Sequence, residues 1–152
     1  MKKEETIIKT DNSIKAIYRF DARKKVIRPL IGMKVPAGFP SPAQDYIEDS
    51  LDLNEHLVPH PASTYFVRVD GESMINAGIY PDDILVVDRS LEAAHNRVVI
   101  AFIDGELTVK RLKVKDGKYL LVPDNQEYPS IKIEEWMDMT IWGVVTYVIH
   151  KV

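Results

Sequence analysis

Short runs of β-favouring residues dominate the chain after residue 60. Turn signals separate these runs, including two Asp-Gly pairs, Asp104-Gly105 and Asp116-Gly117, which are typical of tight hairpins. The pattern predicts a mainly β fold, a compact antiparallel β-domain that is partly closed or sandwich-like. The six predicted strands, rich in Val, Ile, Tyr and Thr, are residues 64–69, 83–88, 96–104, 106–114, 118–123 and 139–152.

Two other elements are predicted before residue 60. Residues 41–58 suit a short helix, because Ser41 can cap it, Pro42 fits its first turn, and apolar residues follow at helical spacing. Residues 1–37 are apolar in places without a clear period, and we expect an extended N-terminal arm with short strands. This arm is too short for a three-helix DNA-binding unit and has no helix-turn-helix pattern.

Charge divides the chain at the same place. The net charge is −3, but residues 1–37 carry +6 and residues 38–152 carry −9. Either a solvated basic tail stands beside an acidic domain, or a basic arm lies against an acidic body. The negative total argues against nucleic acid as the main partner, so no sequence-specific DNA binding is expected.

Composition excludes several classes of protein. No apolar run approaches the ~18 residues of a membrane span, and the N-terminus has no secretory signal, so we expect a cytoplasmic chain without a membrane partner. The absence of cysteine excludes disulfides, zinc-thiolate sites and a cysteine nucleophile. The four histidines show no metal-ligand spacing, and no phosphate-binding glycine loop occurs, so neither metal nor cofactor is predicted. A Ser-His-Asp triad stays open, although no GxSxG elbow is present.

The first segment with candidate chemistry contains Ser73, which closely follows the predicted strand 64–69 in a glycine-containing turn. Serines in turns usually stabilise the turn itself. The functional alternative is a nucleophile, flanked by backbone N–H groups that face an oxyanion.

The second segment is the predicted strand 106–114, which contains Lys110. Alternation along a strand places Lys110 on the same face as Thr108 and Leu112. One interpretation is an exposed face on which the lysine protects a sheet edge. The other is a buried lysine whose pKa is lowered until it can act as a base.

Taken together, these segments resemble a known family. The match runs over roughly residues 35–152 and includes "GFPSPAQDYIEDSLDLNEHLVPHPASTYFVRVDGESM", "DGELTVKRL", "VPDNQEYPSIKI" and "WGVVTYVIH". The chain resembles the UmuD proteins, relatives of the LexA-type self-cleaving repressors, and so is expected to share their C-terminal β-domain. The resemblance implies that Ser73 is the nucleophile, Lys110 the general base, and the Ala37-Gly38 bond the substrate. It also implies an oxyanion hole from the backbone N–H groups of Glu72 and Ser73. UmuD proteins typically have Cys-Gly at the cleaved bond, where this chain has Ala-Gly.

The resemblance further implies a function in the SOS response to DNA damage. Self-cleavage would remove the arm, residues 1–37, and leave residues 38–152 as a peptidase and dimerisation domain. The RecA-DNA filament would stimulate the cut, and the trimmed homodimer would join an UmuC-type subunit of an error-prone translesion polymerase.

Other classes of function remain open. A LexA-like transcriptional repressor would need a DNA-binding unit before the cleavage site, which the β-leaning arm does not provide. A non-catalytic dimer module would regulate a polymerase through its arm alone. Signal peptidases share a Ser-Lys dyad but need a membrane anchor, which the sequence lacks.

Overall fold

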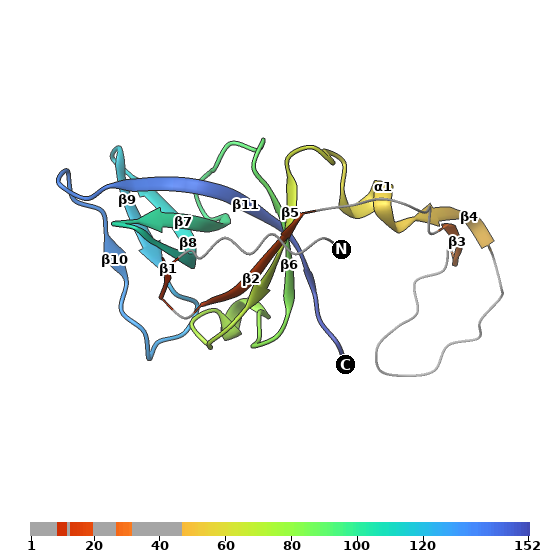
Figure 1. Cartoon of the computed structure of the whole chain (residues 1–152), viewed down its shortest axis with the longest axis horizontal. Coiled ribbons are helices and arrows are strands. Elements are labelled where there is room, and N and C mark those ends of the chain that lie inside the picture. The colour runs from red at the N-terminus through yellow and green to blue at the C-terminus, as the bar shows by residue number, and fades with distance from the viewer. Residues whose placement is uncertain (1–8, 12, 20–26, 32–46) are drawn as a thin grey trace. The chain divides into compact units, whose positions relative to one another are not determined.

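The computed structural model in Figure 1 describes residues 9–11, 13–19, 27–31 and 47–152. The chain forms two compact units, one of Met1–Asp21 with His60–Val152 and one of Ala22–Pro59. The predicted boundary between residues 37 and 38 is a site of covalent cleavage, so it is a different kind of division from these two packed units. Because it lies outside the described residues, it stays a prediction.

A single curled sheet makes up most of the larger unit, in which all described strand pairs are antiparallel except β1 with β8. Strand pairing runs in the order β10-β9-β8-β7-β11-β6-β5-β2, and β1 pairs with β8. The mainly β, antiparallel fold class is therefore confirmed. The strands are β1 (Lys9–Thr10), β2 (Ile14–Arg19), β5 (Thr64–Val69), β6 (Ile84–Asp88), β7 (Val98–Ile103), β8 (Glu106–Lys115), β9 (Lys118–Val122), β10 (Ile131–Lys132) and β11 (Met139–Ile149), with a short 3-10 helix η1 (Ile75–Ala77).

Both predicted Asp-Gly hairpins are present. β7 joins β8 through Asp104-Gly105, and β8 joins β9 through Asp116-Gly117, each as a two-residue loop. The four residues have φ between 47° and 92°. Positive φ at both central positions is the geometry that matches the twist of the flanking strands, and Asp-Gly tolerates it. These turns fix the register of β8, the strand that carries Lys110.

The core lies on both faces of β8. Leu107 and Val109 belong to one cluster of buried apolar side chains, whereas Leu112 belongs to another. Each of these three side chains is at most 1% exposed. The alternation inferred for this strand is correct, and buried apolar side chains pack on both of its faces.

The arm contributes to the same sheet. β2 lies antiparallel to β5, and Ile14 at its start is buried in the main core cluster. The short strands expected in the arm are therefore present in its described residues. An exposed ion pair of 3.0 Å between Lys15 and Asp82 also joins the arm to the body.

The smaller unit corrects the predicted helix over 41–58. Ile47–Asp52 form a strand, β4, which pairs with β3 (Ile27–Ile31), and only Leu53–Leu57 are helical, as α1. The N-cap is Asp52, whose carboxylate accepts a hydrogen bond from Asn54 N. Residues four apart fall on one face of a helix and also on one face of a strand, so the spacing from Ile47 to Leu51 misled the prediction. The expected cap Ser41 lies outside the described residues.

Candidate active site

Ser73 lies in the turn that follows β5, one residue before Met74, the N-cap of η1. Its side chain is buried, with 7% of the residue exposed. The turn is short because Met74 O accepts hydrogen bonds from Ala77 N and Ile79 N at 3.0 and 3.3 Å. Burial restricts the rotamers that the Ser73 side chain can adopt, and this restricts the direction of its hydroxyl.

Two residues that the sequence did not mark hold this turn from the other side of the site. Asn125 Nδ2 donates to the backbone oxygen of Glu72 at 2.9 Å, and Asp124 O accepts from Asn76 N at 2.9 Å. Asp124 is itself fixed by a bidentate contact from Arg111 on β8. Both belong to the segment "VPDNQEYPSIKI", but neither has a local pattern that indicates contact with a turn some 50 residues earlier.

Lys110 is the buried basic residue of the site, 4% exposed. Its Nζ lies 3.3 Å from Ser73 Oγ, although the two residues are 37 positions apart. Nζ also donates to Thr108 Oγ1 at 2.8 Å and to the backbone oxygen of Val109 at 3.1 Å. The predicted shared face of Thr108 and Lys110 is therefore confirmed. The interpretation of Lys110 as an exposed edge protector is wrong, because its side chain is buried and bonded to Thr108 and Ser73.

Lys110 also marks a change of partners along β8. On one edge, β7 pairs with Glu106 through Arg111. On the other edge, β9 pairs only from Arg111 onward, and β1 pairs only with Glu106 and Leu107. The intervening residues 108–110 pair with neither of these two strands, and Val109 N instead donates to Ser13 Oγ at 3.2 Å.

Burial is the main influence on the protonation of Lys110. Desolvation lowers the pKa of its amine, because an ammonium group loses its water shell inside the protein. The carboxylate of Asp11, 3.4 Å from Nζ, raises the pKa in opposition. Burial prevails, and the pKa lies below its usual value of 10.5. The neutral form, which can accept a proton from a serine hydroxyl, is therefore more populated than for a solvated lysine.

A cavity of about 220 Å³ opens over the two groups. Glu72 and Ser73, whose backbone N–H groups were expected to bind an oxyanion, are both among the residues that line it. Tyr128 closes another part of the wall. The expected scissile residues, Ala37 and Gly38, lie outside the described residues, so the structure does not test their position. We call Ser73, Thr108, Lys110 and Asp11 the serine–lysine cluster.

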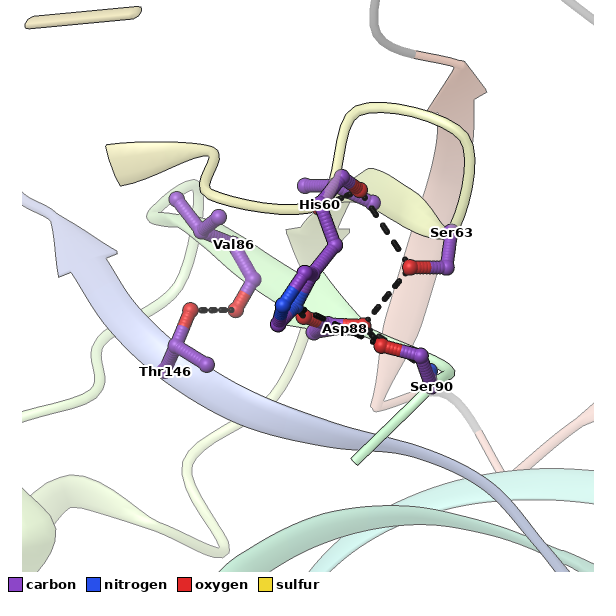
Figure 2. Close-up of polar contacts among 7 residues, drawn as sticks. His60, Ser63, Val86, Asp88, Ser90 and Thr146 are labelled. Carbon is purple, nitrogen blue, oxygen red and sulfur yellow. Dashed lines mark hydrogen bonds and ion pairs between the residues drawn. The ribbon is translucent and has the colours of Figure 1, made fainter. Parts of the chain in front are cut away.

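A second polar cluster contains serine, histidine and aspartate (Figure 2). Figure 2 shows the side chains of His60, Ser63 and Ser90 converging on Asp88 at the end of β6. His60 Nδ1 lies 2.6 Å from Asp88 Oδ2, and the Ser63 and Ser90 hydroxyls donate to Oδ1 at 2.9 and 2.7 Å. We call these four residues the His60 cluster.

The His60 cluster does not have the geometry of a catalytic triad. In a triad, the serine contacts the histidine nitrogen opposite the one that contacts the aspartate. Here Ser90 Oγ is 3.4 Å from the same Nδ1 that faces Asp88, and both serine hydroxyls donate to the carboxylate. Neither serine is activated by this arrangement, so these residues do not form the Ser-His-Asp triad that the sequence left open.

Comparison with known proteins identifies the family of the chain. The Peptidase S24-like family matches residues 29–146, and the chain belongs to this family. Protein ImpA of Salmonella typhimurium is 48% identical over 126 residues, which cover 82% of this chain and 85% of that protein. Protein MucA of the same organism is 46% identical, over 78% of this chain and 82% of its own length.

The LexA repressor of Ectopseudomonas mendocina (strain ymp) is 38% identical, over 81% of this chain and 60% of the repressor. The resemblance to the UmuD and LexA group is thereby confirmed. Within the described ranges of the chain, no helix combines the length and the apolar character that a membrane crossing requires.

Proposed function

We propose that this protein is a serine endopeptidase that cuts its own chain between Ala37 and Gly38, with Ser73 as nucleophile and Lys110 as general base. The observation that carries the proposal is the 3.3 Å separation of Ser73 Oγ and Lys110 Nζ in a buried site beside an open cavity. Serine needs a neighbouring base to become a nucleophile, and a lysine needs burial to become that base. Membership of a peptidase family supports the same chemistry.

The reaction proceeds in two stages. Ser73 Oγ attacks the carbonyl carbon of Ala37 while its proton passes to the neutral amine of Lys110. The N–H groups of Glu72 and Ser73 stabilise the oxyanion that forms. Lys110 then returns the proton to the Gly38 nitrogen as the peptide bond breaks, which leaves an ester between Ser73 and Ala37. Water then attacks the ester carbonyl while Lys110 takes its proton, and Lys110 returns that proton to Ser73 Oγ as the ester bond breaks.

The cellular setting of the proposal is self-cleavage in the SOS response, in the cytoplasm. The cut is stimulated by a RecA-DNA filament, and the trimmed homodimer becomes the partner of an UmuC-type subunit in translesion synthesis. The similarity to ImpA, MucA and LexA proteins supports this setting. An activating filament would act by stabilising the form in which the scissile segment is docked, without adding chemistry.

Intact-mass measurement on the purified full chain tests the proposal. We expect wild-type protein, incubated without any activator, to yield two products, residues 1–37 and 38–152. Ser73→Ala should yield none, and Ser73→Cys should retain some activity because a thiol is an intrinsically good nucleophile. Ser90→Ala is the control: it removes a serine hydroxyl that donates to Asp88 in the His60 cluster, and cleavage should proceed normally.

The result also separates the alternatives. Wild-type protein that stays intact at every pH and with RecA filament would indicate a non-catalytic dimer module. Cleavage that persists in Ser73→Ala and stops in Ser90→Ala would transfer the active site to the His60 cluster.

A further inference from the structure

Asp11 and Ser13 of the arm lie between the two elements that carry Ser73 and Lys110. Asp11 N donates to the backbone oxygen of Leu107 on β8 at 3.3 Å, and Ser13 Oγ accepts from Val109 N at 3.2 Å. On the other side, Ser13 O accepts from Asp70 N, directly after β5, at 2.8 Å. These bonds are made mostly by backbone groups, so this part of the arm is held over the site in a defined position.

The position brings the Asp11 carboxylate onto Lys110. Asp11 Oδ2 is 3.4 Å from Lys110 Nζ, and it also accepts a hydrogen bond from the hydroxyl of Thr108. Asp11 Oδ1 accepts from Ser13 N at 3.0 Å. Burial alone would raise the pKa of Asp11, but hydrogen bonds from Ser13 and Thr108 and the charge of Lys110 together lower it. Asp11 is therefore an anion at neutral pH.

The hydrogen-bond partners of Nζ show what this anion does. A neutral amine has two N–H donors and one lone pair, whereas an ammonium group has three donors. Thr108 Oγ1 and Val109 O accept two of these donors. The third position then holds either the lone pair, which can take the Ser73 proton, or a third hydrogen, which the Asp11 anion attracts. Asp11 thus favours the form of Lys110 that cannot act as a base.

We propose that Asp11 is a positioning residue that holds Lys110 in its protonated form and so slows self-cleavage. This inference rests on the proposed function. Asp11 lies outside residues 29–146, the range that the family match covers. Asp11 also precedes the proposed scissile bond, so the residue that slows cleavage belongs to residues 1–37, the fragment that cleavage separates.

Other ionisable groups around the cavity do not take this role. Asp70, Glu72 and Tyr128 line the same cavity. Among the described residues, Asp11 is the carboxylate that forms an ion pair with Lys110 Nζ. The arm is basic overall and the body acidic, but at this site an acidic residue of the arm contacts a basic residue of the body.

The test compares Asp11→Asn with wild type. Asparagine keeps the shape of Asp11 and the Oδ1 that accepts from Ser13 N, but it removes the charge and replaces Oδ2 with an amide nitrogen. The matched control is Asp82→Asn, which removes the same charge and the exposed Lys15 ion pair between arm and body, at a position whose φ of 70° asparagine tolerates. Self-cleavage rates of the full chains are measured by intact mass from pH 6 to 11, without activator. In parallel, the pKa of Lys110 is measured by NMR of labelled lysine in Ser73→Ala protein, which does not need to cleave.

We expect Asp11→Asn to lower the pKa of Lys110 and to raise the rate at pH 7 by about three- to tenfold, the effect of a half-exposed ion pair. The rate at the high-pH plateau should not change, because Lys110 is neutral there in both proteins. Asp82→Asn should match wild type in both measurements. An unchanged Lys110 pKa in Asp11→Asn overturns the proposal, as does a rate that falls equally at every pH. If wild-type protein does not cleave at all, the peptidase function fails, and the NMR titration still decides whether Asp11 controls Lys110.

Discussion

The serine–lysine cluster and the His60 cluster each bury an ionisable side chain, but the first favours the neutral form of that side chain and the second its charged form. Asp88 is 2% exposed and receives hydrogen bonds from His60, Ser63 and Ser90. Burial by itself would raise the pKa of Asp88, but these donors outweigh it and lower the pKa to about 2. Lys110 is equally buried, yet one carboxylate at the rim of the site is its described anionic partner.

The difference teaches how burial can produce either structure or reactivity. A buried charge that is matched on all sides stays charged and becomes a fixed anchor. A buried charge whose desolvation outweighs the attraction of its partners shifts toward its neutral form. Asp88 therefore stays charged and ties the end of β6 to His60, the residue at which the chain re-enters the larger unit. The pKa of Lys110, in contrast, can be adjusted by its surroundings.

The largest effect should follow Lys110→Arg. Arginine preserves the charge but cannot lose its proton in the accessible pH range, so no base remains beside Ser73. Self-cleavage should fall by about 10²- to 10⁴-fold or below detection, as measured by intact mass. Lys115→Arg, an exposed position on the same strand, is the control and should cleave at the wild-type rate. Cleavage by Lys110→Arg at a normal rate would show that another group is the base.

A smaller loss should follow Asn125→Asp, which tests how Ser73 is held. Aspartate keeps the acceptor for Glu127 N but cannot donate to Glu72 O, so the turn that carries Ser73 loses one support. We expect the plateau rate to fall by about ten- to a hundredfold, the cost of a misplaced reacting group. The pH midpoint of the rate should stay in place, because Lys110 is untouched. A displaced midpoint with an unchanged plateau would contradict this role.

The His60 cluster should respond in stability instead. Asp88→Ala removes the buried carboxylate that accepts from the hydroxyls of Ser63 and Ser90, and we expect a loss of about 1–3 kcal/mol in the free energy of unfolding. The urea midpoint measures this loss. Below the unfolding transition, the variant should still cleave itself at close to the wild-type rate. A variant that is fully stable but does not cleave would mean that the two clusters are coupled.

The weakest effect is the acid dependence of stability. Because the pKa of Asp88 falls from 3.8 to about 2 on folding, its stabilising contribution is fully present above pH 3.8. That contribution is lost as the pH falls through about 2, since the folded protein must then bind the proton too. Urea midpoints of wild type and Asp88→Asn, compared between pH 2 and pH 6, should converge at the acid end. A constant difference across this range would show that Asp88 is not held as an anion.

Sequence predicted the parts of the molecule that have short-range patterns. β-branched runs and Asp-Gly pairs located the strands, and alternation placed Lys110 beside Thr108. The helix over 41–58 failed because a four-residue spacing suits helix and strand alike, and pairing with β3 decided between them. Nothing local distinguished a buried Lys110 from an exposed one, because its burial depends on which strands flank β8.

The finer features of the site depend on contacts between distant residues. Asp11 and Lys110 are 99 positions apart, and Asn125 and Glu72 are 53 apart, so no spacing rule brings them together. The charge division suggested attraction between a basic arm and an acidic body. The exposed pair of Lys15 and Asp82 fits that idea, but the contact at the active site has the opposite polarity.

The pH-rate profile of unassisted self-cleavage tests most directly whether neutral Lys110 activates Ser73. Because burial lowers the pKa of Lys110, the wild-type rate should rise about tenfold per pH unit from near neutral pH and level off above that pKa, below the usual 10.5. Lys110→Ala, measured beside it on the same full chain, should stay near zero throughout. A flat wild-type profile, or a Lys110→Ala profile that still climbs with pH, would contradict the assignment of Lys110 as the base.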